Sequence, residues 1–199
     1  MPVLTIAATW SADVGSTGAQ YPGDTEDTLG FFEGATEYRI PSRFVLSQLP
    51  ADAIISDVSL LNNVLGFESG ANRPFSIGRY GSNGQTDPSK QNATTNYSNC
   101  DLIANPTWVY VSGKTEFQTV GEISISLGGA GSQVVLDILA AKAVDLFSIA
   151  IAQEPPLVGN NSSRMSEYNV ALGPRLQITY TRPVKVGFKT FPLKMLRRS

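Results

Sequence analysis

The hydrophobic residues between positions 38 and 63 fall into two runs that a short turn separates. Residues 44–46 are apolar, residues 49–52 (Leu-Pro-Ala-Asp) interrupt the run, and residues 54–61 resume it. Pro50 has no amide hydrogen to donate, so a strand does not continue through it. Both runs are too apolar for a sheet that has one face in water. The pattern therefore predicts two strands, joined by a turn and covered by a second layer from elsewhere in the chain.

Short apolar or alternating segments recur along the rest of the chain. Residues 138–143 (Ile-Leu-Ala-Ala-Lys-Ala) are the only segment with a convincing helical composition, and residues 11–28 and 155–163 are typical of loops. We expect about nine to eleven short strands in all, at the spacing typical of an all-β, two-sheet sandwich with one short helix. Besides the two strands above, the candidate segments from which these strands come are residues 3–10, 29–32, 64–67, 75–80, 108–111, 117–120, 122–127, 134–137, 146–152 and 176–180.

Two of these segments alternate strictly between apolar and polar residues. Residues 122–127 place Ile123, Ile125 and Leu127 on one face, and residues 176–180 do the same with their own apolar side chains. A period of two is the side-chain period of a strand. Both segments are therefore predicted to be strands with one face in the core.

The chain has 199 residues, of which 42% are hydrophobic, with 18 Gly and 12 Pro, which suits one domain of many short elements. Its charge is divided unevenly. Residues 1–181 carry a net charge of −8, whereas residues 182–199 carry +6 and contain no acidic residue. We therefore expect a β-sandwich domain at 1–181 followed by a basic C-terminal arm at 182–199.

The sequence of the arm is patterned, whereas a basic tail that is only solvated needs no such pattern. Apolar side chains alternate with Lys or Gly over residues 184–189, which is the pattern of a strand whose apolar face meets another surface. The arm either packs on its own domain or extends the sheet of a neighbouring subunit, with its last cations on an acidic surface. The acidic body disfavours nucleic acid as a partner. The assembly residues are Val184, Lys185, Val186, Phe188, Lys189, Phe191, Lys194, Arg197 and Arg198.

The sequence offers little that could carry catalysis. It contains no histidine, which removes the usual general base and the commonest transition-metal ligand. Cys100 is the single cysteine, so an internal disulfide is excluded, and it has no evident catalytic partner. Residues 113–115 (Gly-Lys-Thr) lack the upstream glycine of a phosphate-binding loop and read as a hairpin turn. We predict no catalytic residue, no metal site and no cofactor.

One acidic group leaves an alternative open. Asp13, Asp24, Glu26 and Asp27 lie in the Gly-rich segment 11–28. Oxygen ligands at close spacing can hold Ca²⁺, although the ordered spacing of a calcium loop is missing. Solvated loop charge is the competing interpretation, and the sequence does not decide between the two.

Residues 81–99 are almost all polar and predict a long surface loop, where binding sites tend to lie. Sugar rings stack on aromatic faces beside amides and carboxylates. Trp10 and Trp108 are expected to pack in the core, and Tyr21 is a further aromatic candidate. The preferred glycan-binding residues flank or lie in the loop: Tyr80, Asn83, Gln85, Asn96 and Tyr97.

Several ordered patterns give the chain a family resemblance. Residues 38–44 read Tyr-Arg-x-x-x-Arg-Phe, the turn Leu-Pro-Ala-Asp-Ala and the strand Ile-Ile-Ser-Asp-Val-Ser-Leu follow, and residues 173–180 read Gly-Pro-Arg-Leu-Gln-Ile-Thr-Tyr. Over about residues 5–181 the chain resembles DNRLRE-type β-sandwich modules. That resemblance implies a jelly-roll topology and either carbohydrate-binding or adhesive modules of bacterial surface proteins or phage structural proteins.

Three departures from that resemblance favour the phage context. The Trp-containing middle segment common in such modules is not recognisable between residues 92 and 103, residues 1–10 lack the basic and long apolar segments of a secretion signal, and the tail from Arg182 lies outside the module. Charged residues also interrupt the apolar stretch 134–152, so it is no membrane span. We therefore expect a non-enzymatic virion protein, such as a capsid decoration, cement or minor head or tail protein. It is made in the host cytoplasm, is virion-associated, and docks on copies of itself or on other virion proteins such as a capsid shell. The alternative is a carbohydrate-binding or adhesive module that recognises a surface glycan.

Overall fold

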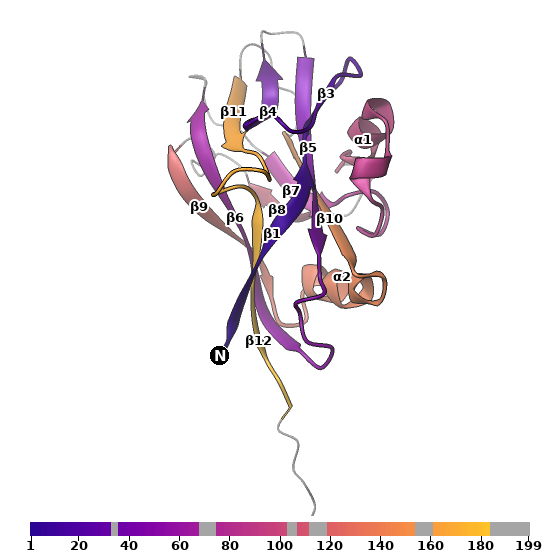
Figure 1. Cartoon of the computed structure of the whole chain (residues 1–199), viewed down its shortest axis with the longest axis vertical. Coiled ribbons are helices and arrows are strands. Elements are labelled where there is room, and N and C mark those ends of the chain that lie inside the picture. The colour runs from indigo at the N-terminus through magenta and orange to yellow at the C-terminus, as the bar shows by residue number, and fades with distance from the viewer. Residues whose placement is uncertain (33–35, 68–74, 103–106, 112–118, 154–160, 184–199) are drawn as a thin grey trace, which may run out of the picture.

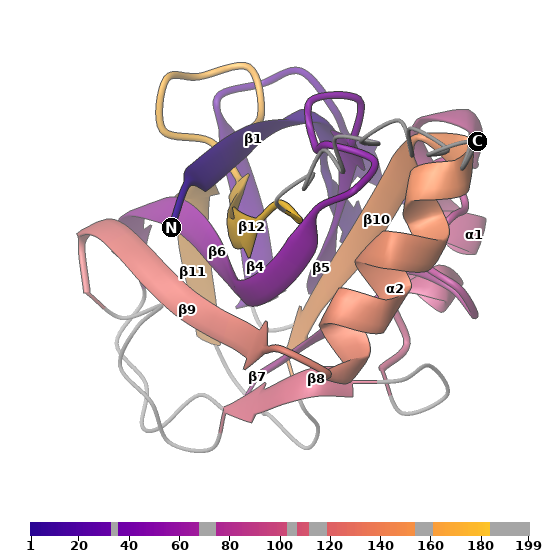
Figure 2. The same cartoon turned by 90° about the horizontal axis from the view of Figure 1, so that it is seen from below.

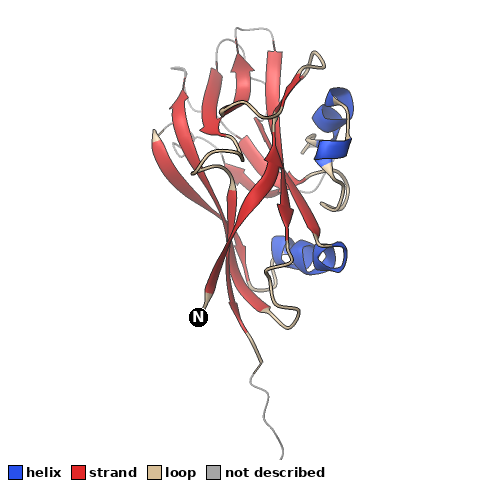
Figure 3. Ribbon diagram, in the orientation of Figure 1, coloured by secondary structure: helices blue, strands red, loops and turns tan. Residues whose placement is uncertain are grey.

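The computed structural model describes residues 1–32, 36–67, 75–102, 107–111, 119–153 and 161–183. Strands dominate these residues, and both α-helices lie on the same flank of them (Figures 1 and 3). The prediction of an all-β protein is confirmed. The strands are β1 (Val3–Ser11), β2 (Asp13–Gly15), β3 (Gln20–Tyr21), β4 (Glu26–Phe32), β5 (Thr36–Val45), β6 (Ile54–Phe67), β7 (Phe75–Arg79), β8 (Thr107–Val111), β9 (Gly121–Gly129), β10 (Leu146–Gln153), β11 (Asn161–Ser166) and β12 (Arg175–Thr181).

Six strands close into a ring in the order β1, β12, β6, β11, β4, β5 and back to β1, and every pairing is antiparallel. Closure depends on β1, which pairs with β12 over residues 3–7 and then with β5 over residues 8–11. The other strands extend the ring: β10, β7 and β8 follow β5, β9 pairs with β6, and β2 pairs with β5 and β3. A closed ring leaves its own six strands with few exposed edges.

The two runs of residues 38–63 are strands β5 and β6, as predicted, and they do not pair with each other. In the ring, two strands separate them on either side. Phe44 of β5 and Val58 of β6 are fully buried in one hydrophobic core. Both apolar strands therefore face one core, and strands from elsewhere in the chain also contribute buried residues to it, as the sequence required.

The turn between these strands is also buried at one point. Leu49 is 1% exposed, and its amide donates to the carbonyl oxygen of Leu46 at 2.9 Å. The amide of Ala53 donates to the carbonyl oxygen of Pro50 at 3.1 Å. These bonds reverse the chain between the end of β5 at Val45 and the start of β6 at Ile54.

The prediction of one short helix with a strand before it was wrong in both respects. The segment 134–137 belongs to α2 (Gln133–Ala141), and a second helix, α1 (Ala93–Asn99), lies in the segment expected to be loop. Buried Val134, Val135, Ile138 and Ala141 follow helical rather than alternating periodicity. With this face α2 contacts β6, β9 and β10, and it lies along the flank of the barrel beside β10 (Figure 2). Short 3₁₀ helices also occur at Pro88–Lys90 and Lys142–Val144.

The alternating segments form strands as expected. Ile123, Ile125 and Leu127 of β9 are buried, and so are Leu176 and Ile178 of β12. The segment 11–28 was expected to be loop or short edge structure over most of its length, and it contains the short strands β2 and β3 and the start of β4. Residues 117–118 of one predicted strand lie outside the described residues.

β11 is a strand that the sequence did not indicate. Its residues, Asn-Ser-Ser-Arg-Met-Ser, are almost all polar, and the sequence predicts loop up to residue 163. It nevertheless pairs with β4 and β6 on its two sides, and Ser162, Ser163 and Met165 are buried. Pairing on both edges buries side chains that composition alone assigns to the surface.

β12 ends at Thr181, which is the boundary predicted between body and arm. Arg182 follows, and its Nε lies 2.7 Å from Oδ1 of Asp52. The predicted assembly residues from Val184 to Arg198 lie outside the described residues. In the part of the chain that the structure describes, no helix has the length and apolar character needed to span a membrane.

Candidate functional site

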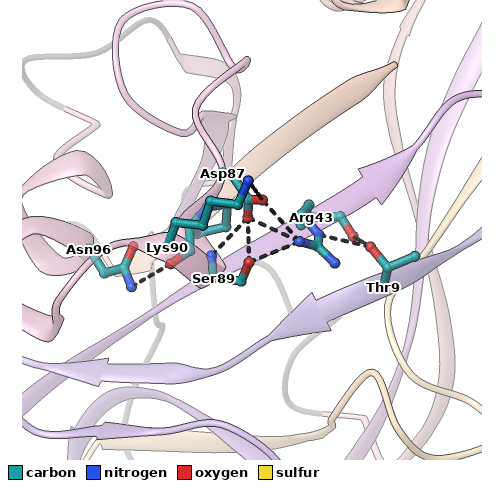
Figure 4. Close-up of polar contacts among 7 residues, drawn as sticks. Thr9, Arg43, Asp87, Ser89, Lys90 and Asn96 are labelled. Carbon is teal, nitrogen blue, oxygen red and sulfur yellow. Dashed lines mark hydrogen bonds and ion pairs between the residues drawn. The ribbon is translucent and has the colours of Figure 1, made fainter. Parts of the chain in front are cut away.

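The segment 81–101, expected to bind a ligand, is fastened to the barrel by polar side chains. Nη1 of Arg43 on β5 lies 3.1 and 3.0 Å from the two carboxylate oxygens of Asp87, and 2.9 Å from Oγ of Ser89 (Figure 4). Nε of Arg43 also donates to Oγ1 of Thr9 at 2.9 Å. Burial raises the pKa of Asp87, but hydrogen bonds from Ser89 and the charge of Arg43 outweigh it, so the pKa lies below its ordinary value. The carboxylate is thus held in its charged form.

Tyr80 lies in the interior, which contradicts its prediction as a glycan-binding residue. Its side chain is fully buried, its hydroxyl donates to Oδ1 of Asn96, and Nδ2 of Asn99 donates to the hydroxyl at 3.1 Å. A sugar ring needs an exposed aromatic face. Tyr80 has none, so this prediction was wrong.

Asn96 and Tyr97 of α1 are likewise engaged within the protein. Asn96 is fully buried, and its Nδ2 donates to Oε1 of Gln20 at 2.8 Å and to the carbonyl oxygen of Pro88 at 3.0 Å. The guanidinium carbon of Arg39 lies 4.1 Å from the ring centroid of Tyr97. The Tyr97 hydroxyl also donates to Oε2 of Glu37 at 2.5 Å. These residues hold α1 against β5.

The other two predicted residues of this loop lie nearer the surface. Asn83 is exposed and Gln85 is half-buried, and the backbone amide of Gln85 donates to Oδ1 of Asn83 at 2.9 Å. The structure therefore does not assemble the five predicted glycan-binding residues into one exposed aromatic platform.

The two tryptophans and the cysteine pack against other parts of the fold. Trp10 is buried as expected, and Trp108 stacks on Phe147 with ring centroids 5.5 Å apart. Cys100 is fully buried, and burial raises the pKa of its thiol. A thiol that stays protonated is a poor nucleophile.

A pocket with a volume of about 610 Å³ opens over the start of β4, and no residue of the segment 81–101 lines it. Three carboxylates line it, from Asp13, Asp24 and Glu26, together with the aromatic side chains of Tyr21, Tyr38 and Phe67. Arg164 of β11 also lines the pocket, and its Nη1 lies 3.2 Å from Oε2 of Glu26. Three of the four acidic residues that the sequence singled out at 11–28 thus meet at one cavity.

The fourth acidic residue, Asp27, is fully buried, and so is Glu167, which follows β11. Oγ of Ser11 donates to Oδ2 of Asp27 at 2.6 Å, and the amide of Gly23 donates to Oε1 of Glu167 at 2.6 Å. The second oxygen of each group, like Oδ1 of Asp13, is buried and accepts no hydrogen bond from the described residues. Buried carboxylate oxygens without donors disfavour the charged form.

The pKa values reflect this crowding. Burial raises the pKa of Asp13 to about 6; the amide of Thr28 opposes the shift, and the charge of Asp24 reinforces it. Burial raises the pKa of Glu167 to about 7, with opposition from the Gly23 amide and reinforcement from Asp24. Burial also raises the pKa of Asp27 well above its ordinary value, against the Ser11 hydrogen bond. Between about pH 4 and 6 these groups therefore retain protons that ordinary carboxylates have lost.

The calcium alternative receives no geometric support. Within the described ranges, no group of three or more carboxylate or thiol side chains is arranged to hold a metal ion. The acidic segment is also not simply solvated loop charge, because Asp13 is only 5% exposed and Asp27 is not exposed at all. Sequence reasoning found the acidic residues of the segment but missed Glu167, since nothing in its local sequence links it to a segment more than 100 positions earlier.

No protein family model matches the chain, and no curated protein matches its sequence.

Proposed function

We propose that this chain is a non-enzymatic structural protein that attaches through residues 182–199 to further copies of itself or to other virion proteins. In this proposal the body is a jelly-roll sandwich, the context is a phage particle, and the position is that of a capsid decoration or minor head or tail protein. The chain is made in the host cytoplasm and becomes part of the virion. The likeness of residues 5–181 to DNRLRE-type modules supports the context.

The observation that carries the proposal is how the arm is rooted in the barrel. β12 leads directly into residue 182, and it is hydrogen-bonded to β1 on one side and to β6 on the other. A strand with neighbours on both sides does not peel from a sheet as an edge strand does. A force that pulls on the arm would therefore be resisted by the hydrogen bonds of β12 to both neighbouring strands. Stable attachment to another protein requires such resistance.

A second contact holds the start of the arm. The guanidinium of Arg182 donates to both carboxylate oxygens of Asp52, at 2.7 and 3.1 Å, in the turn before β6. Paired hydrogen bonds of this kind fix the direction of the arginine side chain. The pair is exposed, so it orients the arm more than it adds to stability.

The charge of the chain supports attachment over chemistry. The arm carries +6 and the body −8, so the arm of one copy is attracted to the body of another. The chain has no histidine, and its only cysteine is a buried thiol with a raised pKa. The chain thus lacks histidine, which is the commonest general base, and has no reactive thiol.

The test removes residues 184–199 and keeps all the residues that the structure describes. We expect the shortened protein to retain its circular dichroism spectrum and cooperative unfolding but to remain a monomer in light scattering. We expect the full chain to associate at low salt and to dissociate at high salt, because salt screens exposed charge pairs.

A matched control separates charge from length. In the full chain, Lys185, Lys189, Lys194, Arg197 and Arg198 are replaced by Gln, which leaves the apolar residues of the arm in place. We expect this variant to associate much more weakly than the original chain. Association of the shortened protein at the strength of the full chain would refute the proposal.

A further inference from the structure

The acidic pocket and the start of the basic arm lie at opposite ends of β6. Thr181, where β12 ends, pairs with Ile54 at the start of β6, whereas Phe67 at the end of β6 lines the pocket. β6 spans Ile54–Phe67, and a strand of this length extends roughly 40 Å. The end of the barrel that carries the arm is thus remote from the end that carries the pocket (Figure 1).

The pocket carries more negative than positive charge. Asp13, Asp24 and Glu26 line it, and Arg164 is the cation paired with Glu26. Asp13 is 5% exposed, and its Oδ1 accepts no hydrogen bond from the described residues. A carboxylate this deeply buried needs a donor or a cation nearby to be stable in its charged form.

Aromatic side chains stand at the same opening. Tyr21 is 48% exposed and Phe67 is 44% exposed, and both line the pocket with the half-buried Tyr38. Apolar and aromatic surface can cover the carbon stem of a long cationic side chain, and a ring face attracts its charged end. The pocket therefore offers both parts of a site for Lys or Arg.

We propose, on the basis of the function proposed above, that this pocket receives a Lys or Arg side chain from residues 182–199 of a second copy of the chain. Charge favours this occupant: the arm has six cationic residues and no acidic one. A neutral sugar could donate hydrogen bonds to the carboxylates but would not balance their charge. The pocket volume of about 610 Å³ is within the usual range for sites that bind small groups.

The arrangement is directional. Because arm and pocket lie at opposite ends of the barrel, the arm of one copy entering the pocket of the next makes a head-to-tail contact. Such a contact uses two different surfaces, so it propagates into a ring or an open filament rather than a closed symmetric pair. An arm that reached the pocket of its own copy would have to run back along the length of β6.

The test uses full-length chains throughout. Asp24→Asn and Glu26→Gln weaken the pocket charge, and Asp145→Asn is the matched control. Asp145 is an exposed carboxylate that does not line the pocket, and Asn tolerates its positive φ of 55°. The probe is a fluorescent peptide with the sequence of residues 182–199. We expect each pocket substitution to weaken peptide binding and self-association about tenfold, and the control to change neither.

Mixing two defective chains tests the head-to-tail contact. One chain has the Lys and Arg residues of its arm replaced by Gln and keeps its pocket; the other carries Asp24→Asn and Glu26→Gln and keeps its arm. We expect each to be monomeric when measured separately and the mixture to form a one-to-one complex. If the pocket variants associate as strongly as the original chain, the pocket is not the acceptor, although assembly through the arm would stand.

Other results overturn the inference in different ways. A full chain that stays monomeric at every concentration and binds the peptide only after its own residues 184–199 are removed would mean that the arm occupies its own pocket. Binding of uncharged oligosaccharides in the pocket, without peptide binding, would identify a glycan site instead. If the original chain neither associates nor binds the peptide at low salt, assembly by self-attachment also fails.

Discussion

Arg79 of β7 donates from Nε to Oδ2 of Asp137 on α2, with the two atoms 2.6 Å apart. The same oxygen accepts from Nε1 of Trp108 at 2.7 Å, and Oδ1 accepts from Nε2 of Gln133 at 2.8 Å. Asp137 is 6% exposed. One buried carboxylate therefore joins the helix to strands β7 and β8.

Replacing Asp137 by Ala should destabilise the fold strongly. The change leaves the Arg79 guanidinium and the Trp108 indole without their acceptor in a partly buried place, and breaking a buried pair from one side costs about 3–5 kcal/mol. We expect the lower part of that range, because the Arg79 side chain retains some exposure. Urea unfolding at pH 7 measures the loss, and Asp145→Asn, at an exposed carboxylate, should change the free energy of unfolding by less than about 0.5 kcal/mol. Equal stability of the two variants would contradict this assignment.

Several strands that the sequence predicted correctly have burial that alternates along the chain. In β9, Ile123, Ile125 and Leu127 are buried between exposed Glu122, Ser124 and Ser126. That alternation is a local property and can be seen without knowing the partner strands. The same reasoning located β1 and β12, whereas β5, β6 and β10 were located as apolar runs.

The elements that the sequence predicted wrongly depend on tertiary contacts that a local pattern does not show. Val134 and Val135 favour strands by composition, but with Ile138 they share the face of a helix that meets β9 and β10. β11 looks like loop because its polar residues are buried only by pairing with β4 and β6. The candidate site could be predicted only in part for the same reason. The acidic residues at 11–28 are visible in the sequence, whereas the burial of Asp27 and its closeness to Glu167 come from strand pairing.

Asp87 should stabilise the fold at neutral pH and lose this effect at low pH. Its pKa lies below the ordinary value, so its contribution is present above the pKa of the unfolded chain, near 4, and is lost as the pH falls through the lower folded value. Asp87→Asn retains a good capping residue for the 3₁₀ helix at Pro88–Lys90 but loses the charge facing Arg43. We expect a loss of about 1 kcal/mol at pH 7, from a partly exposed pair, and almost none at pH 2.

Hydrogen exchange can locate the effect of Asp87→Asn. Amides of α1 should exchange faster in the variant, because the Asp87 contact helps to hold the segment 81–101 on β5. Amides of β9, on the other side of the barrel, should keep their protection and act as the internal control. A uniform increase in exchange over both elements would instead indicate general destabilisation.

The buried carboxylates predict the opposite pH dependence. Asp13, Asp27 and Glu167 all have raised pKa values, with Asp13 at about 6 and Glu167 at about 7. The native state therefore binds more protons than the unfolded chain between about pH 4 and 7, and its stability falls as the pH rises through that window.

Asp27→Asn replaces the most buried group by a neutral one of similar shape that can still accept a hydrogen bond from Ser11. We expect it to stabilise the fold by about 1–3 kcal/mol at pH 8 and to have little effect at pH 4, where the carboxyl is neutral in the native state and about half neutral in the unfolded chain. Urea unfolding of both proteins at pH 4, 6 and 8 gives the comparison, with Asp145→Asn as a control that should follow the original chain at each pH. An Asp27→Asn protein that is less stable than the original chain at pH 8 would show that this carboxylate is stabilised in its charged form, contrary to the direction of its pKa shift.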